Sequence, residues 1–354
     1  MKAIMNTTYG PIDGLAVREI PTPAIGDGEV LVRVRAAAVH IGDVFGVLGS
    51  PLPVRAVTGL RRPIVGVPGF DVAGIVEAVG PGVTRFRSGD VVFGVGVGAA
   101  AEFAKAKESR LAPMPAGLSF EEAAAIPTSG GAALHGLRDA GRLAAGQRVL
   151  IIGASGGVGT FEVQIAKALG AEVTAVVSTR NVELVRSIGA DHVIDYSRSD
   201  FAAGGVAYDL IIDNIESRPL GDVRRALAQD GTLVLNSGRD AGGLRGLIRL
   251  VRPILLSPFS GQTLRRYVSN PDAEDLAVLA DLVDAGKLRP VIDATFPLSE
   301  TAAALRHVAD GHPAGKVVIS VSREPAADRA AASTPERSTI DGRPMEVGPV
   351  ALEV

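Results

Sequence analysis

Four glycines fall within seven residues in the segment GASGGVG, residues 153–159, which directly follows the apolar run RVLII. Such a turn from strand into helix can bind phosphate, because the first N–H groups of the helix lack intrahelical partners and its dipole is positive there. The spacing matches G-x-G-x-x-G with Ala154 at the first position, which alanine can occupy where φ is negative. Gly159 is placed for close packing of helix on strand. We expect a pyrophosphate-binding turn of a dinucleotide site; the alternative is a purely structural turn.

The next predicted strand ends in VVSTRN, where a dinucleotide site selects between NAD and NADP. An acid at this place holds the ribose 2′-hydroxyl of NAD, whereas a basic group accommodates the 2′-phosphate of NADP. Ser178, Thr179 and Arg180 offer two hydroxyls and a guanidinium, and no carboxylate ends the strand. The sequence therefore favours NADPH over NADH. For Arg180, the alternative is a solvated cation at the start of a helix.

The composition of the chain restricts the classes of function. With 354 residues there is room for two domains, and a net charge of −3 offers no basic surface to nucleic acid or anionic lipid. The absence of cysteine excludes a disulfide framework and a cysteine nucleophile. Neither a signal-like N-terminus nor an apolar stretch of about 18 residues occurs. We expect a cytoplasmic enzyme that acts on a small molecule, without nucleic-acid or membrane partners.

Two patterns of secondary structure divide the chain. Up to about residue 120, short β-branched runs alternate with Gly/Pro turns, as in small antiparallel barrels or sandwiches. From about 148 to 240, buried apolar strands alternate with amphipathic helices, which indicates a doubly wound parallel sheet. Residues 243–286 are predicted to be mostly helical, and a strand, a helix and a strand follow. The tail 322–354 is expected to be disordered or loosely docked.

The combined motifs resemble the medium-chain dehydrogenase/reductases, specifically their zinc-independent quinone oxidoreductase-like branch. The resemblance covers residues 1–321 and rests on PGFDVAGIVEAVGPGVTRFRSGDVVFG, AAAIPTSGGAAL, GQRVLIIGASGGVGTFEVQIAKALGAEV and GHPAGKVVISV. In this family the phosphate loop commonly begins with alanine. The resemblance implies an α/β fold with a GroES-like, β-rich catalytic domain (1–122 and 290–321) and a Rossmann doubly wound parallel-sheet domain (123–289). It also implies a homodimer that uses NADPH.

The resemblance further implies which residues hold NADPH. Ser178 and Arg180 would hold the 2′-phosphate, Tyr196 would stack near the adenosine, and Asn214 would lie along the ribose and nicotinamide. For Tyr196 and Asn214 the alternative is a capping role at the end of a strand. The expected cofactor contacts come from the phosphate loop and the strand ends: Gly153, Ser155, Gly156, Gly157, Val158, Ser178, Thr179, Arg180, Tyr196, Asn214, Ser237, Gly238 and Thr128.

A catalytic zinc site is not expected. Zinc alcohol dehydrogenases of the superfamily have a histidine where this chain has Phe70, and they use cysteine ligands that this chain lacks. His40 and Asp71 alone cannot supply the three converging ligands that a catalytic zinc requires. Without a Lewis acid, the easier reaction is hydride delivery to a conjugated, electron-poor acceptor. The expected substrate is therefore a quinone or an α,β-unsaturated carbonyl compound, reduced at its β-carbon.

His40 and Asp43 are the candidate catalytic residues. The segment AAAVHIGDVFG puts them three residues apart on one side of a helical turn, where the family usually has Asn-x-x-Asp. His40 is expected to polarise the substrate or donate a proton; the alternative is a backbone hydrogen bond, with Asp43 fixing its tautomer. Asp43 is expected to act as a scaffold residue. Ala132 replaces the threonine that relatives have near the nicotinamide, which leaves Thr128 or Ser129 as the candidate hydroxyl.

Two further segments concern the substrate. The small residues of the loop GVGVGAAAEF predict a roomy site suited to a polycyclic substrate. Arg245, Arg249 and Arg252 share one helical stripe, either as a solvated face or as a mouth that attracts an acidic substrate.

The main hypothesis is a zinc-independent, NADPH-dependent enone or quinone reductase in a biosynthetic pathway. The alternatives are a non-redox cyclase, lyase or dehydratase on the same fold, and a non-enzymatic nucleotide-binding accessory protein.

Overall fold

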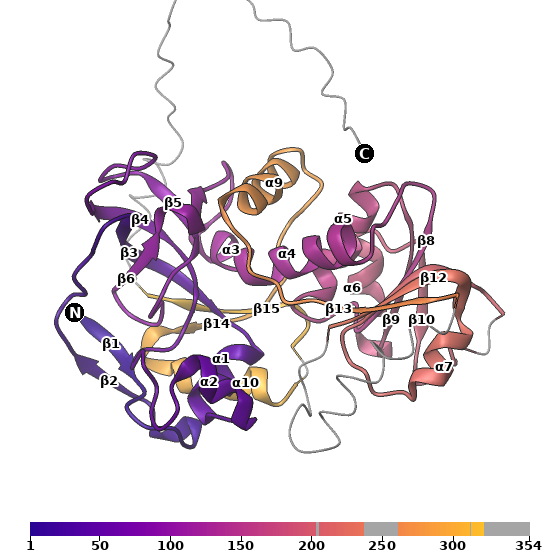
Figure 1. The fold of residues 1–354 in the computed structure, drawn as a ribbon, viewed down its shortest axis with the longest axis horizontal. Coiled ribbons are helices and arrows are strands. Elements are labelled where there is room, and N and C mark those ends of the chain that lie inside the picture. Colours follow the sequence, from indigo (N-terminus) through magenta and orange to yellow (C-terminus); the bar gives the residue numbers. More distant parts are fainter. Residues whose placement is uncertain (203–204, 237–260, 312, 322–354) are drawn as a thin grey trace, which may run out of the picture. The chain divides into compact units, whose positions relative to one another are not determined.

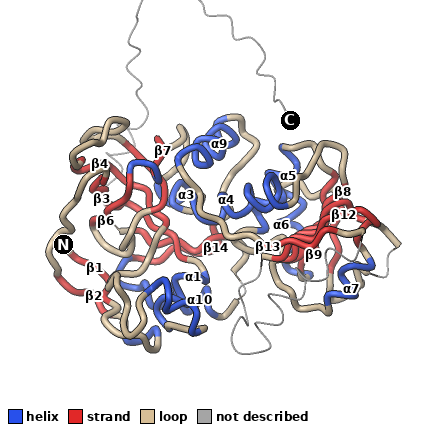
Figure 2. Tube along the Cα trace, in the orientation of Figure 1, coloured by secondary structure: helices blue, strands red, loops and turns tan. Residues whose placement is uncertain are grey.

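The computed structural model describes residues 1–202, 205–236, 261–311 and 313–321. All of these residues belong to one compact unit, the first along the chain. The predictions for Ser237, Gly238, the arginine stripe and the tail lie outside the described residues. Two large sheets organise the first unit, one mainly antiparallel and one parallel (Figures 1 and 2). Among the described residues, none of the helices combines the length and the apolar composition needed to cross a bilayer.

The mainly antiparallel sheet combines strands from both ends of the chain. Its strands follow the order β14-β15-β3-β4-β5-β7, and β6 pairs with β3 beside that path. All pairs are antiparallel except β14 with β15. The strand bounds are β3 Glu29–Val39, β4 Asp71–Val79, β5 Val91–Val95, β6 Phe103–Lys107, β7 Leu111–Pro113, β14 Ile292–Pro297 and β15 Lys316–Ser320. A separate antiparallel pair consists of β1 (Lys2–Met5) and β2 (Ala16–Glu19).

Short helices accompany this sheet. One residue separates the end of β3 from α1 (Ile41–Leu48), so His40 lies between a buried strand and a helix N-terminus. α10 (Thr301–Ala309) contacts α1 and β15. The remaining helices on this part of the chain are α2 (Arg55–Thr58) and α3 (Phe120–Ala124). α3 contacts β3 and β4 and leads the chain towards the second sheet.

The second sheet is entirely parallel, which confirms the predicted doubly wound architecture. Its order is β10-β9-β8-β11-β12-β13, with the reversal of strand order between β8 and β11. Ligands of open parallel sheets bind at the carboxyl ends of the strands at such a reversal. The bounds are β8 Arg148–Ile152, β9 Glu172–Val177, β10 His192–Asp195, β11 Tyr208–Asp213, β12 Leu227–Leu235 and β13 Thr263–Arg266.

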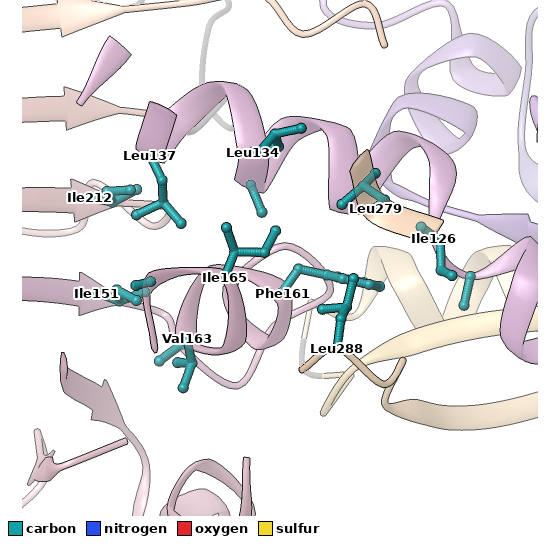
Figure 3. Packing of buried hydrophobic residues seen from close by; sticks show 14 of the residues in the cluster. Ile126, Leu134, Leu137, Ile151, Phe161, Val163, Ile165, Ile212, Leu279 and Leu288 are labelled. Atoms are coloured by element: carbon teal, nitrogen blue, oxygen red, sulfur yellow. The ribbon is translucent and has the colours of Figure 1, made fainter. Parts of the chain in front are cut away.

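Apolar side chains cover both faces of the parallel sheet. Val149 and Ile151 of β8 belong to a cluster with α4 and α5, whereas Leu150 and Ile152 pack in a cluster with α7. On the first face, Leu137 lies between Ile212 of the sheet and Ile165 of α5 (Figure 3). The alternation explains why the strands are almost continuously apolar. The helix bounds are α4 Pro127–Leu134, α5 Gly159–Ala168, α6 Val182–Ser187, α7 Leu220–Arg225 and α9 Ala273–Asp284.

The prediction that residues 243–286 are mostly helical is wrong for β13. Thr263–Arg266 forms the outermost strand of the parallel sheet and pairs with β12. An outer strand is only partly covered, so its sequence TLRR lacks the apolar run that marks the central strands. Arg265 donates instead to the backbone of Ala140, and Arg266 pairs with Glu216. α9 does fulfil the helical part of the prediction.

Candidate active site

Two adjoining cavities lie at the carboxyl ends of the parallel strands. One has a volume of about 220 Å³ and is lined by His40; the other has about 410 Å³ and is lined by Arg180. We call them the His40 cavity and the Arg180 cavity. They share five lining residues and so form one trough: Gly153, Gly156, Ile215, Gly311 and Pro313. Its position is the ligand-binding position of doubly wound folds.

The glycine segment forms the middle of this trough. The positive φ of the turn, +81°, falls on Gly153, while Ala154 is fully buried and is not among the described residues with positive φ. Alanine is therefore tolerated there, as expected. At Gly159 an added Cβ would lie 2.3 Å from the Gly153 carbonyl oxygen, so only glycine permits the close crossing of α5 over β8. Gly156, Gly157, Val158 and Gly159 all line the His40 cavity, so the N-terminus of α5, where the helix dipole is positive, faces it.

The Arg180 cavity collects the polar residues predicted for the adenosine end. Ser155, Ser178, Arg180 and Tyr196 all line it. Tyr196 is more than half exposed, so its ring is free to stack on a ligand. Arg218, which the sequence did not single out, lines the same cavity. Two arginines and two serines thus line a cavity that suits a doubly charged anion, and Arg218 is also paired with Asp200 at 2.8 Å.

Thr179 and an acid on the neighbouring strand form a separate cluster at this end. Thr179 does not line either cavity; its hydroxyl donates to Asp195 Oδ2 at 2.6 Å. Ser197 holds the other carboxylate oxygen through both its backbone N–H and its hydroxyl. These hydrogen bonds lower the pKa of Asp195. Asp195 ends β10 rather than β9, which is why inspection of the VVSTRN segment did not reveal it.

His40 caps α1 and lines its cavity. Its Nδ1 accepts a hydrogen bond from Gly42 N at 3.0 Å, and Asp43 Oδ2 accepts one from His40 N at 2.8 Å, which together form a capping box. Because Nδ1 accepts, the neutral ring carries its proton on Nε2. The Gly42 N–H thus favours this tautomer, and Asp43 holds the backbone of His40. Asp43 Oδ2 also lies 3.5 Å from His40 Nδ1, so the alternative that Asp43 fixes the tautomer stays a prediction.

Two neighbours fix the plane of the His40 ring. A Cβ added to Gly42 would lie 2.7 Å from His40 Cε1 and 2.9 Å from Nδ1, so the ring occupies the space that glycine leaves open. On the other side, the ring stacks on Phe70, with centroids 6.2 Å apart and planes inclined by 11°. The residue that replaces a zinc-binding histidine of relatives therefore supports His40.

Asp43 lies outside the trough and faces a different space. Its carboxylate is buried, and burial raises its pKa. It borders a third cavity of about 240 Å³ beneath α1, which we call the apolar cavity. The apolar cavity is formed largely by hydrophobic side chains, among them Val47, Val57, Ile64, Val65, Val67 and Phe70. Phe70 thus has contacts with both this cavity and the His40 ring.

A buried ion pair closes the floor of the His40 cavity. Lys316 Nζ lies 2.9 Å from Ser129 Oγ and 3.4 Å from Asp71 Oδ2, and both charged residues are at most 2% exposed. Asp71 Oδ1 accepts from both the backbone N–H and the hydroxyl of Thr128. Of the two candidate hydroxyls, Ser129 lines the cavity, and that of Thr128 is used on Asp71. Sequence reasoning missed Lys316 because a lysine before an apolar strand is usually solvated.

Beside the phosphate loop, Asn214 and Asn236 line the His40 cavity together with Val158 and Gly157. Asn214 is hydrogen-bonded to Glu162, a fully buried acid on α5. Sequence reasoning missed Glu162 because an acid in the first turn of a helix is normally explained by the helix dipole. In the described ranges, no cluster of three or more His, Cys, Asp or Glu side chains that could hold a metal ion is present.

Comparisons with known proteins identify relatives of the whole described chain. Residues 26–116 match the family model of the alcohol dehydrogenase GroES-like domain, and residues 188–319 match that of a zinc-binding dehydrogenase. A chloroplast envelope quinone oxidoreductase homolog of Arabidopsis thaliana is 32% identical over 90% of this chain and 98% of its own length. A chloroplastic NADPH-dependent alkenal/one oxidoreductase of the same plant is 30% identical over 90% of this chain and 79% of its own length.

A solved structure has the same fold. The structure of a mycobacterial protein complexed with NADPH superimposes with a TM-score of 0.77 at 28% identity, covering 91% of this chain and 100% of that one. The agreement covers both sheets, since the match spans nearly all described residues.

Proposed function

Because the chain belongs to the quinone oxidoreductase-like branch of the medium-chain dehydrogenase/reductase superfamily, we propose that it is an NADPH-dependent, zinc-independent oxidoreductase. It delivers a hydride to a quinone, or to the β-carbon of an α,β-unsaturated carbonyl compound. The observation that carries the proposal is the trough, which runs from Arg180 past the phosphate loop to a histidine with a donor nitrogen. The relatives named as quinone and alkenal/one oxidoreductases support the same chemistry.

The residues of the trough fit NADPH, which supplies the hydride when bound. The N-terminus of α5 and the glycine turn suit the pyrophosphate. Ser178 and Arg180 suit the 2′-phosphate, and Tyr196 suits the adenine ring. Asp195, the acid at the end of the neighbouring strand, is held by Thr179 and Ser197 and is not among the residues lining the Arg180 cavity. These contacts support selection of NADPH over NADH.

The donor set of the chain supports reduction without zinc. The chain contains no cysteine, and Phe70 provides a ring where related zinc enzymes have a ligand. His40 uses Nδ1 to cap α1. The matched family model described as zinc-binding covers residues 188–319, a range that contains neither His40 nor Asp71. A catalytic zinc requires three converging ligands, and the part of the chain that the structure describes contains no cluster of three such side chains.

His40 supplies the electrophilic assistance that a metal would otherwise provide. Its Nε2–H donates to the carbonyl oxygen of the substrate, where negative charge develops as the enolate or hydroquinone anion forms. The Gly42 N–H and the Phe70 ring hold the imidazole in one plane and one tautomer before the substrate arrives. Asp43 is a positioning residue, because its carboxylate holds the His40 backbone and does not reach the trough.

The apolar cavity receives the hydrophobic body of the substrate. Phe70 lines this cavity and stacks on the His40 ring, so the cavity lies next to His40. A quinone or enone whose carbonyl oxygen accepts from His40 can thus place fused rings or an alkyl chain against Val47 and Ile64. This supports the expectation of a bulky, polycyclic substrate and is consistent with a biosynthetic role.

A homodimer built through the parallel sheets is also proposed. β13 is the last strand in the order of this sheet within the described residues. The resemblance to the family, in which dimers form through the parallel sheets, supports this proposal. Light scattering on the purified protein tests this proposal: a monomeric mass across the micromolar range rejects it.

NADPH oxidation in the presence of quinones and enones tests the proposed function. We expect absorbance of NADPH to fall with a naphthoquinone or a β-aryl enone, and His40→Gln to lower kcat with NADPH binding unchanged. Metal-free buffer with a chelator is expected to leave the rate unaltered. Failure of NADPH to bind, or turnover of substrate without NADPH consumption, contradicts the proposal; the second result supports a non-redox enzyme on the same fold.

A further inference from the structure

Three polar side chains from three elements form a hydrogen-bonded chain beside the His40 cavity. Asn236 Nδ2 donates to Asn214 Oδ1 at 2.8 Å, and Asn214 Nδ2 donates to Glu162 Oε2 at 2.6 Å. Asn214 follows β11 and Asn236 follows β12, while Glu162 is on α5 immediately after the phosphate loop. Both asparagines line the cavity, and Glu162 is completely buried behind them. We propose that Glu162 is a positioning residue that sets which hydrogen-bonding group of Asn236 faces the bound nicotinamide cofactor.

The donor-to-acceptor direction of these two hydrogen bonds follows from the chemistry of Glu162 at their buried end. An ionised carboxylate only accepts, so it requires the NH₂ group of Asn214. The carbonyl of Asn214 must then face Asn236, which in turn directs its own NH₂ towards Asn214. In the described part of the chain, the remaining amide oxygen of Asn236 accepts no hydrogen bond from a protein group. Ionised Glu162 therefore leaves Asn236 Oδ1 for a donor such as a ribose hydroxyl or the carboxamide NH₂.

Protonation of Glu162 permits the reverse arrangement. A neutral carboxyl can donate to Asn214 Oδ1, after which Asn214 donates to Asn236 Oδ1 and Asn236 offers its NH₂ to the cavity. Both amides are planar and nearly symmetric in shape, so the reversal needs only two side-chain flips. The two states differ in the group presented to the cofactor and not in the position of any backbone element. The proton on Glu162 thus selects between an acceptor and a donor.

Burial places this protonation within the working pH range. Desolvation raises the pKa of Glu162 to about 8, and the nearby Asp213 carboxylate adds to the rise, while the Asn214 hydrogen bond opposes it. Tyr267 is the other titratable group that interacts with Glu162; its hydroxyl donates to the carbonyl of Ala132, and burial raises its pKa well above the usual value, so it stays neutral while Glu162 titrates. Glu162 Oε1 is buried without a hydrogen-bond partner among the described residues, so no other group stabilises the charge.

The inference depends on the proposed function, since it concerns NADPH in the trough, and a binding measurement separates the two. Fluorescence titration gives the Kd for NADPH from pH 6.5 to 9.5, without any substrate. For the wild-type protein we expect Kd to change about fivefold with a midpoint near pH 8, the equivalent of one neutral hydrogen bond. Glu162→Gln preserves the shape and hydrogen bonding of the side chain but cannot ionise, so it is expected to remove this change of Kd with pH.

Two further variants make the result specific. Asn214→Ser interrupts the series of hydrogen bonds between Asn236 and Glu162. It is expected to weaken NADPH binding and to remove the change of Kd with pH as well. Glu183→Gln alters an exposed acid of α6 that pairs with Arg186 and does not line the trough, so the change of Kd with pH should be retained. If Glu162→Gln keeps the wild-type profile, or if Glu183→Gln loses it, the inference is wrong while the proposed function stands. If NADPH does not bind the wild-type protein at any pH, the proposed function itself fails.

Discussion

The Arg180 cavity and the His40 cavity belong to one trough but are built in different ways. Three of the polar side chains that line the Arg180 cavity, Ser178, Arg180 and Tyr196, stand shortly after β9 or β10, and they are at least partly exposed. The His40 cavity draws its polar groups from β15, α4, α1 and the ends of β11 and β12, and several depend on fully buried charges. A local segment can therefore specify cofactor identity, whereas the chemistry at the other end depends on contacts between distant parts of the chain.

This difference predicts that substitutions in the His40 cavity affect folding more strongly than those in the Arg180 cavity. Buried polar groups are costly once they lose a partner, while exposed groups can be replaced by water. The following experiments compare the two cavities in this respect, beginning with the largest expected effect.

Lys316→Met should cause the largest loss of stability. It removes the cation that faces the buried Asp71 carboxylate and leaves that charge without its ion-pair partner. The expected loss is about 3–5 kcal/mol in the free energy of unfolding, measured by urea denaturation. The double variant Lys316→Met, Asp71→Asn should recover much of it, since no buried charge remains. Equal losses of unfolding free energy in the single and double variants would show that the packing of Lys316, and not its charge, contributes this stability.

Glu162→Gln should change the pH dependence of stability. The folded-state pKa of Glu162 is raised to about 8, so the folded protein keeps a proton that the unfolded chain releases near its ordinary value of 4.5. Its contribution is complete below that value and is lost as the pH rises through about 8. Between pH 5 and 9 the wild-type protein should lose several kcal/mol more than Glu162→Gln, by denaturant titration, an order-of-magnitude figure. Parallel pH curves for the two proteins contradict this prediction.

Gly42→Ala should lower activity without a matching loss of cofactor binding. The new Cβ overlaps the His40 ring, which must turn away from the position that its hydrogen bond to the helix defines. Removal of one donor from a developing oxyanion costs about 10²-fold in kcat, and partial displacement should approach this loss. Steady-state kinetics of NADPH oxidation with a small enone measures it. Gly46→Ala, in the same helix at a position with open space around the Cβ, is the matched control and should retain activity on this small substrate.

Arg180→Ala should weaken NADPH binding and leave NADH binding unaffected. A hydrogen bond to a charged partner contributes about 1.5–3 kcal/mol, so the Kd for NADPH should rise by about 10- to 100-fold. Thermal unfolding is expected to be unchanged, in contrast to Lys316→Met, because Arg180 is exposed. Fluorescence titration with both cofactors provides the measurement. A similar rise for NADH would assign Arg180 to the pyrophosphate or to general electrostatics.

Gly46→Leu should have the smallest effect, confined to substrate choice. Gly46 lines the apolar cavity, and a Cβ there meets no atom within 4 Å, so leucine fills the space without displacing the helix. Activity on polycyclic quinones should fall about tenfold relative to a small enone. Gly221→Leu, an equally open glycine of α7 away from the cavities, controls for the substitution itself. Equal losses on large and small substrates would exclude the apolar cavity as the binding place of the substrate body.

Much of the fold could be predicted because its pattern is local. The continuous apolar runs of β8, β9 and β11, alternating with amphipathic helices, already indicated the parallel sheet. β13 was missed because an outer strand with two arginines carries no such pattern. In the site, Ser178 and Arg180 were singled out because they stand within three residues of a predicted strand end, and Tyr196 was implied by the family resemblance; all three line the Arg180 cavity. Glu162 and Lys316 were not, since nothing in the neighbouring sequence shows that their side chains are buried.

The sequence by itself determined the phosphate loop, the residues at the ends of β9 and β10, and the lack of cysteine ligands, because each depends on residue type and short spacing. The tertiary structure alone decided that Lys316 meets Asp71 and Ser129, and that Glu162 supports Asn214. Lys316 is 245 residues from Asp71 along the chain. Such long-range pairs form only when the chain folds, and it is their removal from water that gives these polar groups their strength.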